Sequence, residues 1–421
     1  MPAPPEHRPK HVSDRASEMT TKGEYRWQFA ARFRRHAYGW KSQPAVMRVK
    51  EAVGEIRTAA RRDPVLGAQG AVAFLERVSP ALELVDSSSG AIGTAVRNAV
   101  RDLAAIIARA PVDAATRQAW LDRLWAAVEA DEIPYIESLG DYWGDLCATK
   151  EIASAWADRT IAATRLALSP NRNVRGFYQG TTVCLSALYS AERYEEILDV
   201  LKIDTIWAYK RWAVLALRAM GKRAEAIRYA EACRSPWTPE REVDAICEEI
   251  LHSSGFVEEA YQRYGLRANQ RSTYLSTYRT IAKKYPHKDS RELLADLVAA
   301  TPGAEPKWFA AAKEAGLYDE ALALAALGPC DPRTLTRAAR DFADVQPAFA
   351  VGAGVLALRW LVAGYGYDVT TIDVREAYDN TVRAADILGE GAATREQIRG
   401  LIAEADSNGF VAKLLGAEFG L

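Results

Sequence analysis

The chain has almost no net charge for its length. Its 421 residues include 54 Lys and Arg and 55 Asp and Glu, which leaves a formal charge of −1. A protein with this balance has no bulk attraction for nucleic acid or anionic lipid. The charge is unevenly placed, however: residues 1–62 hold 14 basic and 6 acidic side chains (14 − 6 = +8), so the rest of the chain carries −1 − 8 = −9. We expect a basic N-terminal part ahead of an acidic body.

Cysteine and histidine are too few and too scattered for several kinds of site. The five cysteines come no closer than Cys233 and Cys247, 247 − 233 = 14 positions apart, which excludes a clustered zinc or redox motif. Such cysteines are typical of small core residues in a reducing compartment, so we expect a cytoplasmic protein. The five histidines provide neither a helical zinc pair nor a partner for a nucleophilic serine or cysteine. We therefore expect no metal, no cofactor and no enzymatic activity.

The sequence also lacks a long apolar run. The longest, from Ala348 to Tyr365, contains Arg359 and several glycines, and it falls short of the ~20 apolar residues of a spanning helix. We expect a buried helix there and no membrane partner. Residues 1–24 lack the apolar core of a signal peptide. Their Pro, His, Ser, Thr and charged residues predict a disordered basic arm.

Helical periodicity dominates the chain from residue 25 onward. Apolar residues recur three and four positions apart, and no convincing segment alternates with the period of two of a β-strand. This pattern predicts an all-α protein. A loop rich in Asn and Pro at 169–173 separates longer helices from shorter ones. We expect an N-terminal helical domain at 25–168, an array of helical hairpins at 173–330 and a C-terminal helical cap at 331–421.

A turn followed by a helix start recurs four times between residues 191 and 321. The copies begin at Ala191, Gly221, Gly255 and Gly316, with spacings of 221 − 191 = 30, 255 − 221 = 34 and 316 − 255 = 61, the last close to two periods. A repeat of this length predicts one helical hairpin per unit. Glycine permits the left-handed backbone of a helix end, and an alanine five positions later lets two helices approach closely. Hairpins of this kind stack into an α-solenoid with an extended binding surface.

These copies resemble tetratricopeptide repeats. Gly316, Tyr318 and Ala321 match that family's turn and second helix, and the copy at Gly255 matches with valine in the aromatic position. The family's first-helix Trp-Leu-Gly signature is missing. The resemblance covers roughly residues 178–330 and implies antiparallel helical hairpins with a concave groove that binds a peptide or another protein.

Two further segments, 139–147 and 307–313, resemble those of a group of bacterial helical proteins, which implies a bacterial setting. From the repeats and the lack of a catalytic constellation, we expect a scaffold or adaptor that binds a protein or peptide partner. Its oligomeric state is left open.

The segment 25–41 mixes cations with aromatic side chains. Cations neutralise phosphates and aromatic faces stack on bases, so the alternative function is association with nucleic acid, for example in bacterial defence or regulation. A docked amphipathic helix is the other interpretation, because Tyr25, Phe29, Phe33 and Ala37 share one helical stripe. The candidate nucleic-acid contacts are Arg26, Trp27, Arg32, Arg34, Arg35, Trp40 and Lys41.

A second candidate binding spot comprises Asp141, Tyr142, Trp143 and Asp145. In one continuous helix the two carboxylates would lie one turn apart on the same face, where paired acids can transfer protons or hold a metal. The aromatic pair could instead pack between helices. Acidic doublets at 195–196, 248–249 and 258–259 lie near hairpin turns, so we expect them to face solvent.

Overall fold

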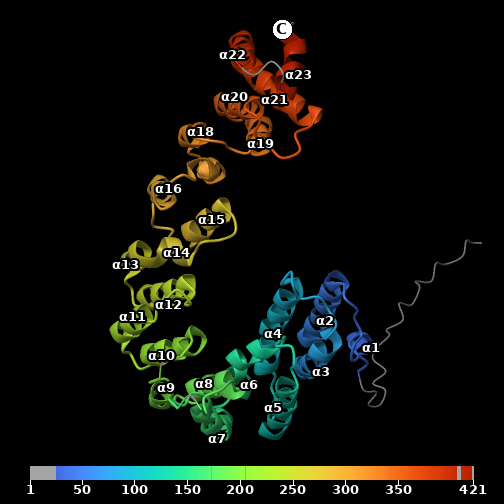
Figure 1. Ribbon diagram of the computed structural model, residues 1–421, viewed down its shortest axis with the longest axis vertical. Coiled ribbons are helices and arrows are strands. Elements are labelled where there is room, and N and C mark those ends of the chain that lie inside the picture. Colours follow the sequence, from blue (N-terminus) through green and yellow to red (C-terminus); the bar gives the residue numbers. More distant parts are fainter. Residues whose placement is uncertain (1–24, 172, 204, 405–408, 420–421) are drawn as a thin grey trace, which may run out of the picture. The chain divides into compact units, whose positions relative to one another are not determined.

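The computed structural model describes residues 25–171, 173–203, 205–404 and 409–419. All regular structure in these ranges is helical and none of it is strand, which confirms the all-α prediction (Figure 1). No helix within them combines the length and apolar character needed to cross a membrane. The arm predicted at 1–24 lies outside the described residues. By its internal contacts the chain divides into two compact units, Met1–Lys222 (unit 1) and Arg223–Leu421 (unit 2).

Unit 1 is built on three long helices, α2, α3 and α4, which pack against one another in pairs. Further along the chain, α7 packs along α8, and α6 contacts both α4 and α8. Asp63, Asp113 and Thr149 cap the first turns of α3, α5 and α7 by accepting bonds from backbone N–H groups. The helices described in unit 1 are α1 Gln28–Arg32, α2 Ser42–Arg62, α3 Pro64–Leu82, α4 Ala91–Arg109, α5 Ala114–Glu129, the 3₁₀-helix η1 Glu137–Tyr142, α6 Trp143–Cys147, α7 Lys150–Ala167, α8 Gly180–Ser190, α9 Tyr194–Val200 and α10 Trp207–Ala219.

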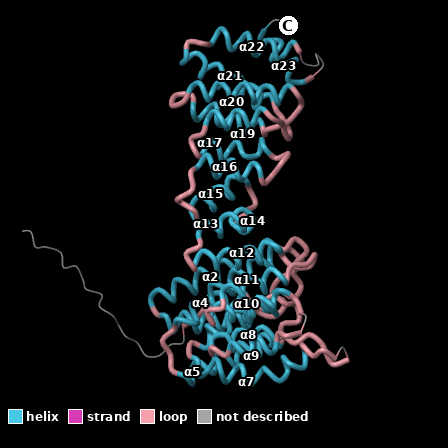
Figure 2. Tube along the Cα trace, turned by 90° about the vertical axis from the view of Figure 1, so that its left-hand side faces the viewer, coloured by secondary structure: helices cyan, strands magenta, loops and turns pink. Residues whose placement is uncertain are grey.

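In unit 2 the helices pack mainly on those that are next, or next but one, in the chain (Figure 2). One hydrophobic core extends through them from Tyr261 to Leu415. The helices described in unit 2 are α11 Arg223–Ala232, α12 Glu240–Ser253, α13 Val257–Ala260, the π-helix η2 Tyr261–Gly265, α14 Leu266–Ala268, α15 Tyr274–Lys284, α16 Ser290–Ala299, the 3₁₀-helix η3 Glu305–Trp308, α17 Phe309–Glu314, α18 Tyr318–Ala326, α19 Pro332–Phe342, α20 Pro347–Val362, α21 Thr371–Leu388, α22 Gly391–Ala403 and α23 Phe410–Phe419.

The boundary between the two compact units does not fall at the loop 169–173, where the change from longer to shorter predicted helices indicates one. The flanking helices α7 and α8 pack along each other inside unit 1. A polar loop reverses the chain direction between packed helices as readily as it separates domains, which is why its composition does not distinguish the two cases. The assignment of a hairpin array to 173–330 and a cap to 331–421 stays a prediction.

The recurrent turn has the same backbone geometry at its three glycine copies. Gly221, Gly255 and Gly316 have φ angles of 79°, 85° and 75°. After the second of them, the N–H of Phe256 donates to the carbonyl of Leu251 at 3.0 Å, and equivalent bonds follow the other two glycines. This is the Schellman motif, in which a left-handed residue ends the helix and its successor bonds five positions back.

The first copy of the turn lies one residue later than the sequence alignment predicts. Glu192, not Ala191, has the left-handed φ of 59°, and Arg193 N–H donates to the Leu188 carbonyl at 2.9 Å. The buried position after the turn therefore belongs to Ile197. The left-handed residue of this copy is a glutamate, whereas the other copies have glycine there. Because no glycine marks the turn, its register could not be predicted from the sequence.

The position five residues after each turn is fully buried. Ala226, Ala260 and Ala321 have no exposed surface, as expected for a small residue where helices approach closely. The same turn also recurs beyond the predicted array, at Gly364 and Gly389 with φ of 84° and 76°. The turn geometry thus continues into residues 331–421, where the sequence repeat is no longer recognisable.

The apolar stretch that begins at Ala348 forms most of α20, a buried helix of unit 2, as predicted. Its Gly354 permits close contact with α21, because a side chain there would occupy the place of Thr381. Cysteines follow the expected pattern as well: four of the five are buried and all are free thiols. Burial raises the pKa of the Cys330 thiol to about 12.

Candidate functional site

The basic aromatic segment docks on unit 1 through two phenylalanines. Phe29 and Phe33 are buried, and both rings pack edge-to-face on Phe74 of α3, with centroids 5.6 and 4.9 Å away. Glu55 of α2 accepts bonds from the backbone N–H groups of Gln28 and Phe29 at the start of α1. These contacts agree with the docked interpretation of the apolar stripe.

The docked segment is not one helix through residue 41. α1 ends at Arg32, and the chain turns at His36, whose φ is 56° and whose N–H donates to the Pro80 carbonyl. Tyr25 and Ala37, the outer members of the predicted stripe, lie outside α1 and are exposed. A left-handed residue and the non-local bond to α3 end the periodicity that the sequence alone would continue.

Two of the cations predicted to contact nucleic acid are already used in ion pairs. Arg32 pairs with Glu51 at 2.8 Å, and Arg35 pairs with Glu83 at 3.5 Å. The other candidate cations, Arg26, Arg34 and Lys41, are exposed and form no ion pair with a described residue.

The two candidate tryptophans of this segment differ in their surroundings. The Trp27 ring occupies the space where a side chain at Gly70 would lie, so it belongs to the docking contact. Trp40 is 73% exposed. An aromatic face for stacking is thus available at Trp40 but not at Trp27.

The Asp141–Asp145 segment crosses a junction between two helices. Asp141 lies on the 3₁₀-helix η1, and Asp145 lies on the short helix α6. The Asp141 carboxylate pairs with Arg211 of α10, whereas Asp145 is exposed in a groove that does not include Asp141. The two carboxylates therefore do not share one continuous helix, contrary to the expectation, and only Asp145 lines the groove.

Trp143 belongs to the core of unit 1 and not to a binding surface. It has no exposed area and packs edge-to-face on Trp156 at 4.9 Å and on Trp125 at 6.0 Å. The next residue, Gly144, donates its N–H to Ser186 Oγ at 2.9 Å, and a side chain there would collide with α8. This half of the candidate spot is structural.

Tyr142 and Asp145 line a groove of about 630 Å³ between α4, α6 and the start of α7, which we call the α4–α6 groove. Its floor consists of alanines of α4, and its cations are Arg101, Arg109 and Lys150. Lys150 pairs with Glu192 at 2.6 Å, but Arg109 has no ion pair with a described residue. Burial, followed by the nearby Asp141 charge, raises the pKa of Tyr142. The groove offers positive charge beside small apolar surface.

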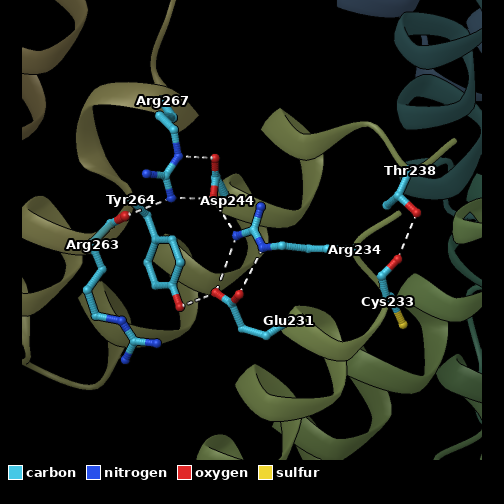
Figure 3. A network of polar contacts seen from close by, with 8 residues as sticks. All are labelled: Glu231, Cys233, Arg234, Thr238, Asp244, Arg263, Tyr264 and Arg267. Carbon is cyan, nitrogen blue, oxygen red and sulfur yellow. Dashed lines mark hydrogen bonds and ion pairs between the residues drawn. The ribbon is translucent and has the colours of Figure 1, made fainter. Parts of the chain in front are cut away.

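A polar network around one buried carboxylate in unit 2 was not predicted from the sequence (Figure 3). Asp244 of α12 is 0% exposed and binds both Arg234, at 2.6 Å, and Arg267, at 2.9 Å. Arg234 also contacts Glu231 at 2.8 Å, and Glu231 accepts a bond from the Tyr264 hydroxyl at 2.6 Å. Burial and this hydrogen bond raise the pKa of Tyr264 above its ordinary range.

Glu248 lies one turn further along α12 and is 1% exposed. It accepts bonds from the Tyr285 hydroxyl at 2.5 Å and the Asn269 amide at 2.6 Å, and it pairs with Lys284 at 2.7 Å. The expectation that the 248–249 doublet faces solvent is therefore wrong for Glu248. Its carboxylate is matched by a cation and by buried donors, which is the arrangement of a structural charge.

The described residues include no group of three His, Cys, Asp or Glu side chains placed to hold a metal ion. Compared with models of known protein families and with curated protein sequences, the chain matches none.

Proposed function

We propose that this protein is a non-enzymatic scaffold that binds a protein or peptide partner on a surface formed by tetratricopeptide-like helical hairpins. The observation that supports this most is the repeated Schellman turn at Glu192, Gly221, Gly255 and Gly316. At each copy a buried residue follows five positions later. Regular repetition of one turn gives regular helix pairs, and proteins built in this way use their extended faces for binding.

The packing within unit 2 agrees with a repeat array. Helices contact their neighbours along the chain, and the core is shared by successive helices instead of being closed around one centre. Five free thiols agree with a reducing cytoplasm, where we place the protein. The α4–α6 groove of unit 1, whose Arg109 has no ion pair with a described residue, is a second candidate contact for a partner.

Nucleic acid is the alternative partner, and exposed Arg26, Arg34, Lys41 and Trp40 support it. Two features weigh against this alternative: Phe29 and the neighbouring apolar residues are used for docking, and two of the candidate arginines are already paired.

The test is capture of partners from native bacterial lysate on the immobilised full chain, with half of the lysate treated with nuclease. We expect the same few proteins in both halves. A variant with Arg26, Arg34 and Lys41 changed to Gln should retain them. Recovery that requires intact nucleic acid and is lost in this variant would replace the scaffold proposal with the alternative. If no partner is enriched from either half of the lysate, both proposals are refuted.

A further inference from the structure

We propose that a pocket at the start of α15 in unit 2 binds a carboxylate of the partner, presented by an acidic peptide segment. This inference rests on the proposed scaffold function and specifies the chemistry of its partner. The pocket has a volume of about 250 Å³ and is enclosed by the end of α14, the first turn of α15, the end of α16 and Trp308. We call it the α15 pocket. Its volume suits one side chain or one chain end.

The lining of the α15 pocket is cationic and contains no carboxylate among the described residues. It includes Arg267, Arg271 and the hydroxyl of Ser272. Thr273 and Thr301 also line it, but their hydroxyls already donate to Ser276 Oγ and to the Leu297 carbonyl. Guanidinium and hydroxyl donors are the groups that bind a carboxylate, and charge-assisted bonds of this kind are stronger than neutral ones. A neutral or cationic group would gain less from the same lining.

The Arg267 charge is paired with Asp244, but three other cations at or beside the pocket are not paired with a described carboxylate. Arg271 forms no ion pair with a described residue. Arg241, which donates to the Gln270 carbonyl at 3.3 Å, and Lys307, whose Nζ lies 5.6 Å from the Tyr274 ring centroid, have none either. We call Arg241, Arg271 and Lys307 the cationic rim. Three uncompensated cations beside a lining without acids attract a negatively charged ligand.

Arg267 is held in position by the buried carboxylate of Asp244 (Figure 3). Its Nε and Nη2 atoms donate to the two carboxylate oxygens of Asp244 at 2.9 and 3.1 Å. These bonds use one edge of the guanidinium, so Nη1 is left to donate to a ligand. A guanidinium that is already ordered loses less conformational entropy when the ligand binds.

The aromatic residues of the pocket favour a peptide carboxylate over a nucleic acid. Trp308 is buried, its ring packs edge-to-face on Tyr274 at 4.7 Å, and its Nε1 donates to Thr301 Oγ1 at 2.7 Å. The ammonium of Lys307 lies over the Tyr274 ring. Single-stranded nucleic acid binds by stacking bases on free aromatic faces, and these two rings do not offer such faces.

The test is fluorescence anisotropy with the full-length protein and short labelled peptides. The first peptide is rich in Glu and has both ends blocked, and the second carries Gln at the same positions. A third, neutral peptide has a free C-terminal carboxylate. Arg271→Gln removes a rim charge at the pocket, and Arg228→Gln is the matched control. Arg228 is an exposed arginine of α11 that does not line the pocket.

We expect the Glu peptide to bind the wild-type protein about 10-fold more tightly than the Gln peptide. The reason is that the Gln peptide lacks the charged acceptor for the arginine donors of the pocket. Arg271→Gln should remove most of this preference, whereas Arg228→Gln should keep it. Tight binding of the third peptide would support the pocket and identify a chain end as the source of the carboxylate.

Equal binding of the Glu and Gln peptides, or equal losses in the two variants, would overturn the assignment. So would displacement of the Glu peptide by a single-stranded oligonucleotide that binds more tightly. Partners captured from lysate separate this inference from the scaffold proposal. If they bind Arg271→Gln and wild type alike, the pocket assignment fails and the scaffold stands; if no partner is captured, the scaffold itself fails.

Discussion

Replacing Glu248 by alanine should destabilise unit 2 by about 3 kcal/mol, because it removes the acceptor of several buried donors. The Tyr285 side chain is fully buried, and its hydroxyl would lose its acceptor at a cost of about 1–3 kcal/mol. The Asn269 amide keeps its second bond, to the Gly265 carbonyl at 2.8 Å. Lys284 would lose its counter-ion, but its side chain reaches solvent, so its contribution is discounted.

Two further substitutions serve as controls. One removes only the charge of Glu248, and the other removes a neighbouring exposed glutamate. Glu248→Gln keeps an oxygen that can accept from Tyr285 and loses the charge opposite Lys284, so we expect a loss of about 1 kcal/mol. The adjacent Glu249 is exposed, and Glu249→Ala should change stability by no more than about 0.5 kcal/mol. The expected order is therefore Glu248→Ala, then Glu248→Gln, then Glu249→Ala.

Urea unfolding followed by circular dichroism measures the total change in stability. Because a chain with two compact units can unfold in more than one step, hydrogen exchange of α12 and α15 should be measured alongside it. Glu248→Ala should speed exchange in both helices. Equal unfolding curves for Glu248→Ala and Glu249→Ala would refute the assignment of a buried structural charge.

Three other predictions follow from backbone, packing and charge. Gly70→Ala would put a methyl group where an aromatic ring of the docked segment lies, so protease cleavage within 25–41 should accelerate. Gly54→Ala, in open space on α2, should instead stabilise the helix by about 0.5–1 kcal/mol. In denaturant titrations, Gly255→Ala should cost about 1 kcal/mol. Glu192→Gly should cost less than this, because it relieves a left-handed φ and loses only an exposed ion pair with Lys150. Hydrogen bonds from an arginine of α19 and from its helix cap lower the pKa of Asp373. Its stabilising contribution is thus present above the unfolded pKa of about 3.9 and lost as pH falls below it, so thermal melts of Asp373→Asn and wild type should converge in acid.

Local sequence signals predicted the features that depend on neighbouring residues. The helical period gave the all-α class, and glycine at helix ends gave the left-handed turns at Gly255 and Gly316. Burial of Phe29 and Phe33 follows from the apolar stripe. The end of α1 was missed, because it depends on a bond from residue 36 to a carbonyl in α3 that is distant in the chain.

The acidic residues of α12 show the limit of what local sequence patterns predict. Val243, Cys247 and Leu251 form the buried stripe of that helix, and Asp244 and Glu248 fall next to it at the spacing of one turn. An acid at such a position predicts burial with a partner, and this signal was available in the sequence. What the sequence could not supply was the partner, because the arginine and the tyrosine that bind these carboxylates lie 23 and 37 positions further along the chain, in α14 and directly after α15. Only the packed fold brings them together, and the same packing places Arg267 at the α15 pocket.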